Sequence, residues 1–155
     1  MSVGDLSPEE IAEQMTLDHM ICFAAYSASQ AMSRFYRPIL DEMGLTYPQF
    51  IVMMVLWETG QTTMKALSDR LILESNTLTP LVKKLEAAGL VTRARNKDDE
   101  RLLDIAATEK GMALKRRGCM APVQLAAATG ETLEGVIELQ QRLANLRDKL
   151  NAKAG

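Results

Sequence analysis

The stretch that decides the fold is residues 62–111, which read TTMKALSDRLILESNTLTPLVKKLEAAGLVTRARNKDDERLLDIAATEKG. Two runs with apolar residues at helical spacing are followed by a glycine stop and then by two short strands around a charged tip. In chain order these segments are 64–71, 75–88, Gly89, 90–95, 96–101 and 102–106. This order predicts a winged helix-turn-helix, which lays one helix in the DNA major groove. The alternative is an ordinary helical hairpin beside an unrelated β-hairpin.

The second helical run carries groups suited to DNA. Short hydroxyl and amide side chains near its start reach base edges, and its two lysines reach phosphates. Glu74 to Asn76 are expected to end the turn and cap the helix. Pro80 is expected in or near the first turn, where a missing N–H costs little. The predicted DNA-contacting residues here are Ser75, Asn76, Thr77, Thr79, Pro80, Lys83 and Lys84.

The charged tip of the hairpin supplies two further candidates. Asp99 stands two residues before Arg101, and we expect it to hold the guanidinium in place. Arg101 then enters a narrow minor groove with less entropy to lose. The alternative is a solvated turn whose incidental ion pairs contribute little.

The stretch from Leu73 to Val91, with Asp98 to Arg101 and Thr108 to Gly111, resembles the MarR family of transcription regulators. Three other segments are similar to its organic-hydroperoxide-sensing branch, the OhrR-type repressors. These segments are CFAAYSAS at 22–29, YRP at 36–38 and LTYPQF at 45–50. The resemblance runs from about Leu17 into the helix after Gly111. It implies a homodimer that binds an inverted-repeat DNA operator and represses a neighbouring peroxidase gene.

Two departures from the branch lie at the start of the recognition helix, where Glu74 and Asn76 replace the usual Asp and Gly. Such changes are expected to retune operator preference without changing the class of protein.

Length and charge agree with this interpretation. A chain of 155 residues is one domain's worth, and its net charge of -2 argues against a generally sticky polycation. From Lys65 to Arg101, eight Lys and Arg face six Asp and Glu, a local balance of +2. No apolar run spans a bilayer and no signal peptide is evident. Two distant cysteines make no disulfide framework, so a cytoplasmic location is expected.

The predicted fold class is mainly α with a small β-hairpin, in a single domain over 1–155. Residues 47–108 form the winged helix-turn-helix, and long helices within 17–45 and 112–150 mediate dimerisation. We expect the first long helix over Leu17 to Met43, adjusted at Pro38. Thr46 and Pro48 start a helix that is apolar nearly all round. A coiled-coil-like stripe near the C-terminus consists of Val136, Leu139, Leu143, Leu146 and Leu150.

We expect DNA binding to depend on the oxidation state of Cys22. It is expected near a helix start, which favours the thiolate. The family resemblance implies that Tyr36 and Tyr47 donate phenolic hydrogen bonds to its sulfur. A thiolate attacks a peroxide oxygen and becomes sulfenic acid. The alternative is a buried, inert thiol. The neighbours expected to form an apolar pocket for an organic hydroperoxide are Met20, Ile21, Phe23 and Tyr26.

Cys119 is a possible second thiol. The resemblance places the resolving cysteine of two-cysteine members near Ala127, eight residues further on. An intersubunit disulfide with Cys22 is therefore not expected, and a low-molecular-weight thiol would complete the oxidation instead.

Two other functions remain open at this stage. In the first, a phenolic ligand binds reversibly near Tyr26, Tyr36 and Tyr47, and Cys22 is structural. In the second, His19 and Cys22 form a thiol peroxidase-like enzyme. The chain offers no further histidine, no orienting group and no oxyanion loop, so an enzyme is not expected. The two cysteines and one histidine lack metal-ligand spacing, and no metal or other cofactor is expected.

Overall fold

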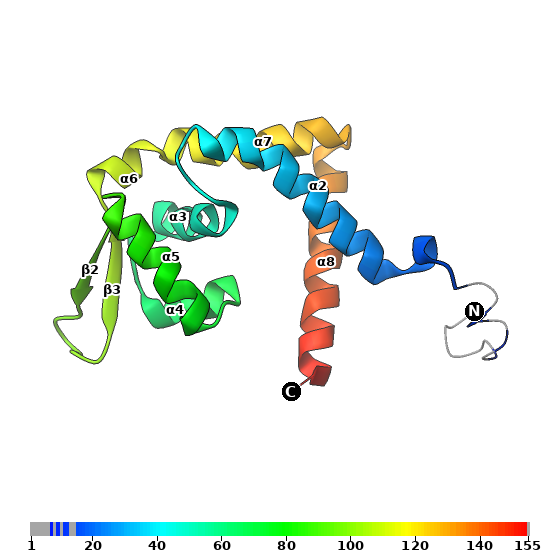
Figure 1. Ribbon diagram of the computed structural model, residues 1–155, viewed down its shortest axis with the longest axis horizontal. Helices are drawn as coiled ribbons and strands as arrows, with labels where there is room; N and C mark the ends of the chain where they lie inside the picture. The colour runs from blue at the N-terminus through cyan, green and yellow to red at the C-terminus, as the bar shows by residue number, and fades with distance from the viewer. Residues whose placement is uncertain (1–6, 8, 10, 13–14, 155) are drawn as a thin grey trace.

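The computed structural model describes residues 7, 9, 11–12 and 15–154, and it is mostly helical with one small sheet (Figure 1). The elements in chain order are η2 (Leu17–His19), α2 (Ile21–Asp41), α3 (Tyr47–Thr59), β1 (Gln61–Thr63), α4 (Met64–Leu71), α5 (Ser75–Ala87), β2 (Val91–Arg95), β3 (Leu103–Ala107), α6 (Glu109–Ala113), α7 (Lys115–Thr129) and α8 (Leu133–Ala154).

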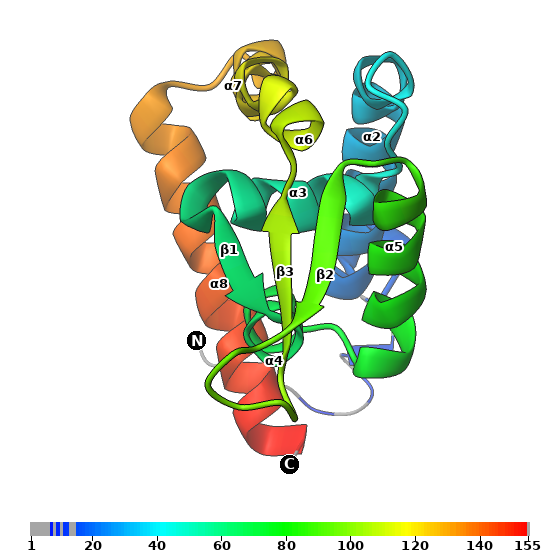
Figure 2. The same ribbon diagram turned by 90° about the vertical axis from the view of Figure 1, so that its left-hand side faces the viewer.

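The central motif has the order that the sequence predicts. Helices α4 and α5 occupy the two periodic runs, and β2 and β3 form the hairpin. The sheet has one strand more than expected, because β1 pairs antiparallel with β3 and gives the order β1-β3-β2. Ile105 in the middle of β3 pairs with Thr62 on one side and Arg93 on the other, and it is fully buried. Figure 2 shows α5 beside the sheet, with α3 and α4 behind it.

The first long helix is shorter than expected. Residues 17–19 form a 3-10 turn, and Met20 is extended at φ -82° and ψ 112° before α2 begins. The helix runs through Pro38 and ends at Asp41. A missing N–H so near the C-terminus removes one hydrogen bond without ending the helix.

Helix α3 forms the centre of the core. A capping box starts it: the Gln49 backbone N–H donates to Thr46 Oγ1, and the Thr46 N–H donates to Gln49 Oε1 at 2.8 Å. The buried side chains of α3 are Gln49, Phe50, Val52, Met53, Val55, Leu56 and Trp57. A helix buried on nearly all sides explains why its sequence shows no polar face.

Trp57 joins the winged helix to the C-terminal helices. Its Nε1 donates to the Gly111 carbonyl oxygen at 2.8 Å. Its ring also lies against Gly118 of α7, where an added Cβ would stand 2.2 Å from ring carbons. Close approach therefore requires glycine at position 118.

The remaining helices project from the winged helix-turn-helix as an arm. In Figure 1, α2 and α7 run side by side away from the sheet, and α8 turns back from the far end of α7. Among the described residues, no helix is both long enough and apolar enough to cross a membrane. The exposed large apolar side chains of α8 are Leu133, Ile137, Leu139, Leu143 and Leu150.

Candidate nucleic-acid interface and thiol site

Helix α5 buries one face and exposes the predicted DNA-contacting groups on the other. Leu78, Val82 and Leu85 are at most 1% exposed and fix the helix on the core. On the opposite side, Asn76, Pro80 and Lys83 follow each other at helical spacing. The predicted residues that the structure leaves exposed are Ser75, Asn76, Thr77, Pro80, Lys83 and Lys84, whereas Thr79 is half-buried.

Two local expectations for α5 are wrong. Glu74 is the N-cap residue, but its side chain makes no capping hydrogen bond. Its carboxylate therefore does not occupy the free N–H groups at the helix start. Pro80 is the sixth residue of the helix, beyond its first turn. A proline there leaves the Asn76 carbonyl without an intrahelical donor on the exposed face.

The turn before α5 contains a left-handed residue that is not glycine. Ile72 ends α4 with φ 55° and ψ 43°, although its side chain is β-branched and 56% exposed. Ser68 holds the turn on both sides: its carbonyl accepts the Leu73 N–H at 3.1 Å, and its hydroxyl donates to the Leu73 carbonyl. These bonds offset the strain and set the entry of α5.

The wing presents Arg101 in the predicted geometry. Asp99 accepts from Arg101 Nε and Nη2 at 2.9 Å each and from the Arg101 backbone N–H at 3.0 Å. The side-chain bonds from Arg101, followed by its backbone bond, lower the pKa of the Asp99 carboxyl. The same pairing raises the pKa of Arg101, whose side chain is 89% exposed. A charged guanidinium is thus held outward at the tip of the hairpin.

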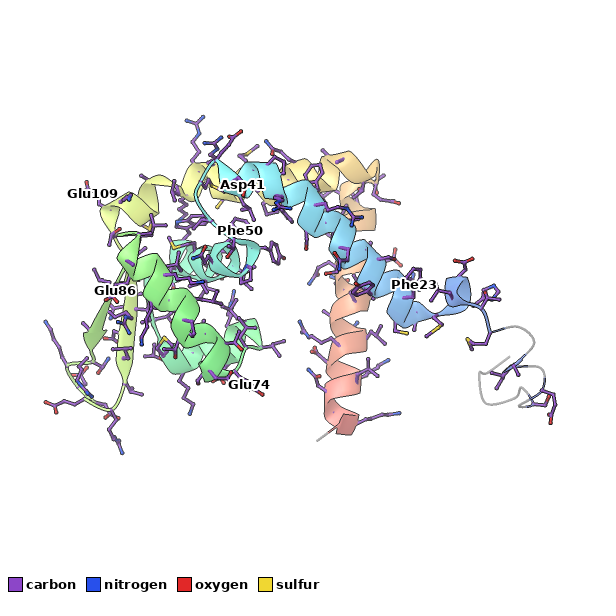
Figure 3. All side chains as sticks on the ribbon, viewed as in Figure 1. Phe23, Asp41, Phe50, Glu74, Glu86 and Glu109 are labelled. Carbon is purple, nitrogen blue, oxygen red and sulfur yellow. The ribbon has the colours of Figure 1, made fainter. Side chains whose placement is uncertain are left out.

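Contacts missed from the sequence tie α5 to the wing and to α6. Arg93 of β2 donates to Glu86 of α5 through Nε at 2.7 Å (Glu86 is labelled in Figure 3). Two donors reach the carbonyls that directly follow α5. Lys110 Nζ donates to the Ala88 carbonyl at 2.8 Å, and Thr108 Oγ1 donates to the Gly89 carbonyl at 2.7 Å. The only signal in the sequence was Lys110 itself, since cations favour helix C-termini, but its distance along the chain concealed the partner.

Cys22 is the second residue of α2 and is exposed, close to a helix start as predicted. The expected apolar pocket around it is not closed within one protomer. Met20, Ile21 and Tyr26 are 38%, 68% and 61% exposed. Figure 3 shows the reason: the labelled Phe23 lies on the arm, far from the winged helix that contains Phe50. The thiol is therefore exposed, and its neighbours along the chain are apolar residues that are themselves largely exposed.

The two phenols form a pair elsewhere. The rings of Tyr36 in α2 and Tyr47 in α3 have centroids 5.5 Å apart. Tyr36 is buried, and burial, followed by the charge of Tyr47, raises its pKa to about 12. Tyr47 remains 43% exposed. Tyr36 stands fourteen residues after Cys22 on one helix, about 21 Å along the axis, so one protomer does not bring the thiol to Tyr36.

An apolar groove connects these two ends of α2. It has a volume of about 380 Å³ and runs from Ile21, the residue before Cys22, to Tyr47, whose ring packs against Tyr36, with α8 along one side. Several of the α2 side chains that line it are small, among them Ala24, Ala25 and Ala28. The lining residues are Ile21, Ala24, Ala25, Ala28, Ser29, Met32, Ser33, Tyr47, Leu139, Leu143 and Leu146.

The remaining candidates are dispersed. Cys119 is a free, exposed thiol of α7. His19 lies in η2, where its Nδ1 is 3.2 Å from Thr16 Oγ1. The extended Met20 separates it from α2, so His19 and Cys22 do not lie on one continuous helix, as a helix over Leu17 to Met43 would require. Within the described ranges, no cluster of three or more His, Cys, Asp or Glu has the arrangement of a metal site.

Comparison with known proteins identifies the class. A family model described as transcriptional regulator SarA/Rot matches residues 34–117. The HTH-type transcriptional regulator TtmR of Methylorubrum extorquens (strain PA1) is 45% identical over 143 residues, 92% of this chain and 73% of TtmR. The organic hydroperoxide resistance transcriptional regulator of Bacillus subtilis (strain 168) is 36% identical over 141 residues, 91% of this chain and 96% of that protein.

A solved structure gives the same answer for the fold and for DNA. Reduced AbfR bound to DNA has a TM-score of 0.76 and 32% identity, and the match covers 92% of this chain and 98% of AbfR. AbfR is a Staphylococcus epidermidis protein. The chain therefore belongs to the SarA/Rot family of MarR-like winged helix-turn-helix proteins, and it is a DNA-binding transcriptional regulator.

Proposed function

We propose that this regulator is a homodimer that binds an inverted-repeat operator and releases it when an organic hydroperoxide oxidises Cys22. The observation that carries the proposal is the division of the thiol site along α2. The thiol lies exposed at one end, and the Tyr36–Tyr47 pair lies at the other. A second copy is needed to bring the two halves together.

The geometry of α2 suits such a pairing. Only Tyr36 and Leu40 of its side chains are buried in one protomer. Two copies that cross antiparallel about a two-fold axis near Ser29, midway between Cys22 and Tyr36, would place each thiol opposite the partner's phenols. The small residues of the groove permit that approach, and the exposed leucines of α8 extend the apolar surface.

The chemistry follows from the two halves. The Cys22 thiolate attacks the terminal peroxide oxygen, an S–O bond forms, and the O–O bond breaks. The leaving alkoxide takes up a proton as an alcohol, and Cys22 becomes a sulfenic acid. A low-molecular-weight thiol then condenses with the sulfenic acid to give a mixed disulfide and water. A tyrosine is neutral at physiological pH, and burial raises the pKa of Tyr36 further, to about 12, so its hydroxyl is available as a hydrogen-bond donor to sulfur.

Release of DNA follows from a change in packing. The added oxygen, and then the added thiol, enlarge a side chain at the proposed contact between protomers. The spacing of the two α5 helices, which must match successive major grooves, depends on that contact. On DNA, Asn76 and its neighbours read base edges, Lys83 and Lys84 contact phosphates, and Arg101 enters the flanking minor groove.

The test compares operator affinity of reduced protein and protein treated with one equivalent of cumene hydroperoxide. We expect wild type to lose affinity, Cys22→Ser to keep it, and the matched control Cys119→Ser to behave as wild type. Release of DNA by the Cys22→Ser protein would contradict the proposal. A covalent dimer on a non-reducing gel that disappears with Cys119→Ser would instead make Cys119 the resolving thiol.

The groove also favours a second candidate function, in which a phenolic ligand binds there reversibly. Its apolar lining and the half-exposed Tyr47 suit an aromatic ring. Release of DNA by a phenol such as 4-hydroxybenzoate, unchanged in Cys22→Ser, would support this alternative. Release of DNA by the peroxide only from proteins that retain Cys22 would contradict it, because Cys22 is merely structural in this alternative.

A further inference from the structure

A series of hydrogen bonds between side chains crosses the base of the wing. It was not predicted from the sequence. Asp104 in β3 accepts from Gln61 Nε2 of β1 at 3.0 Å. On its other side, both carboxylate oxygens of Asp104 accept from Asn96 Nδ2, the first residue after β2, at 3.0 Å each. One carboxylate therefore links all three strands at the end that carries the tip.

Asn96 also bonds to the backbone of the tip. Its Oδ1 accepts the backbone N–H groups of Asp98 and Asp99 at 2.9 and 3.0 Å. Its own N–H donates to the Leu102 carbonyl at 3.0 Å, and the Leu102 N–H donates to the Asp99 carbonyl at 2.9 Å. The backbone of Asp99 is thus fixed from both sides, and Asp99 in turn holds Arg101.

We infer that Asn96 and Asp104 are positioning residues for DNA binding: together they order the wing so that Arg101 is preset for the minor groove. The inference rests on the proposed role of Arg101. Without the pair, the backbone at Asp98 and Asp99 would be ordered only on DNA, and binding would carry the conformational-entropy cost of that step.

The chemistry at position 96 is specific. The side chain must donate to a carboxylate and accept two backbone N–H groups at once, which an amide does and an ionised carboxylate does not. The presence of Asp104 supports a structural use, because an added negative charge on a DNA-facing hairpin repels phosphate. Its Asn96 and Gln61 partners compensate that charge through hydrogen bonds.

The test uses a charge-neutral exchange of the two residues. Asn96→Asp alone removes the Nδ2 donor and sets two carboxylates about one hydrogen-bond length apart. The link between positions 96 and 104 is then lost. The double change Asn96→Asp with Asp104→Asn restores every donor and acceptor: the amide at 104 donates to position 96 and accepts from Gln61, while the carboxylate at 96 accepts the two backbone N–H groups. Asp104→Asn alone controls for the loss of one charge.

Binding is measured by fluorescence anisotropy on a duplex selected by wild type from a random pool, with either A/T-rich or G/C-rich flanks. We expect Asn96→Asp to weaken binding to the A/T-flanked duplex about tenfold, the cost of ordering one to two residues of backbone. Binding to the G/C-flanked duplex should change little, because the guanine amino group already obstructs the minor groove. The double change should return to within about twofold of wild type.

Two further readouts separate positioning from general damage. Amide exchange of Asp98, Asp99 and Leu102 in the DNA-free protein should speed up in Asn96→Asp and recover in the double change. Adding Asn96→Asp to Arg101→Ala should cause little further loss, since without the Arg101 contact the order of the tip no longer contributes to binding.

Unchanged affinity and exchange in Asn96→Asp would overturn the inference, as would failure of the double change to recover in a protein with wild-type thermal stability. An Arg101→Ala protein that binds the A/T-flanked duplex normally would overturn the proposed minor-groove role of Arg101, and with it the part of Asn96 and Asp104 in DNA binding. If Arg101→Ala weakens binding while Asn96→Asp binds normally, the proposed role of Asn96 and Asp104 would be overturned and the role of Arg101 would stand.

Discussion

At the scale of single residues, the most informative side chain is Tyr36. It is 6% exposed, and its ring packs against Tyr47 and Phe50 with centroids 5.5 and 5.8 Å away. Charge on its phenolate is disfavoured by burial and by Tyr47, which is why its pKa rises to about 12. In the proposed mechanism, this protonated hydroxyl donates to the thiolate of the partner subunit.

This shift makes stability depend on alkaline pH. Since the pKa of Tyr36 in the folded protein exceeds the ordinary tyrosine value of 10.0, the folded protein holds the proton more tightly. The stabilisation is fully present below pH 10 and is lost as pH rises through 12, on the order of 2–3 kcal/mol. We expect Tyr36→Phe to flatten the fall in urea-unfolding free energy across that window, and the exposed control Tyr26→Phe to leave it unchanged. An equal slope in wild type and Tyr36→Phe would refute the assignment.

Local residue patterns were predictable, whereas pairings across the fold were not. Asp99 and Arg101 were predicted as a pair because they lie two residues apart in one turn. Asn96 with Asp104 and Glu86 with Arg93 were missed, since each pair meets only after the sheet folds. The separation of Cys22 from Tyr36 was already implied by helix geometry, fourteen residues at 1.5 Å each, but family resemblance alone grouped them as one site.

At the scale of elements, periodicity and end signals located α4, α5 and the hairpin. Strand β1 was missed because three residues carry no alternation, and its partner β3 lies some forty residues later. The start of α2 was placed too early because Met20 breaks a run that looks continuously helical. The junction of α3 with α6 and α7 depends on Trp57 and two glycines, and a sequence does not show which ring faces which glycine.

That junction gives a prediction about two helical glycines. Gly118→Ala would place a Cβ 2.2 Å from the Trp57 ring, so we expect a loss of about 1–3 kcal/mol of unfolding free energy. Gly135→Ala in α8 meets only the flexible end of Glu131 at 3.0 Å and the side chain of Thr132. It should be neutral or stabilise by up to about 1 kcal/mol through helix propensity. Denaturant unfolding measures both, and equal effects would contradict the packing of Trp57.

At the scale of the whole molecule, the arm of α2, α7 and α8 leaves many apolar side chains uncovered in one protomer. We expect Leu143→Glu to reduce dimerisation and, with it, operator affinity by at least about tenfold, because a charge would be buried at the interface. Gln141→Glu adds the same charge on the opposite side of α8 and serves as the control. Light scattering coupled to size exclusion gives the mass, and a Leu143→Glu protein that remains a full-affinity dimer would refute the interface.

The most direct measurement of the central claim, that the thiol of one protomer acts with the phenols of its partner, uses a mixed dimer. One protomer carries Cys22→Ser, and the other carries Tyr36→Phe with Tyr47→Phe. In this dimer the only Cys22 thiol faces an intact Tyr36 and Tyr47 across the interface, whereas its own chain carries phenylalanine at both positions. We predict that cumene hydroperoxide oxidises it at the wild-type rate and releases DNA, while the Tyr36→Phe/Tyr47→Phe homodimer reacts more slowly. Oxidation of the mixed dimer at the slow rate of that homodimer would show that the site lies within one chain and contradict the account.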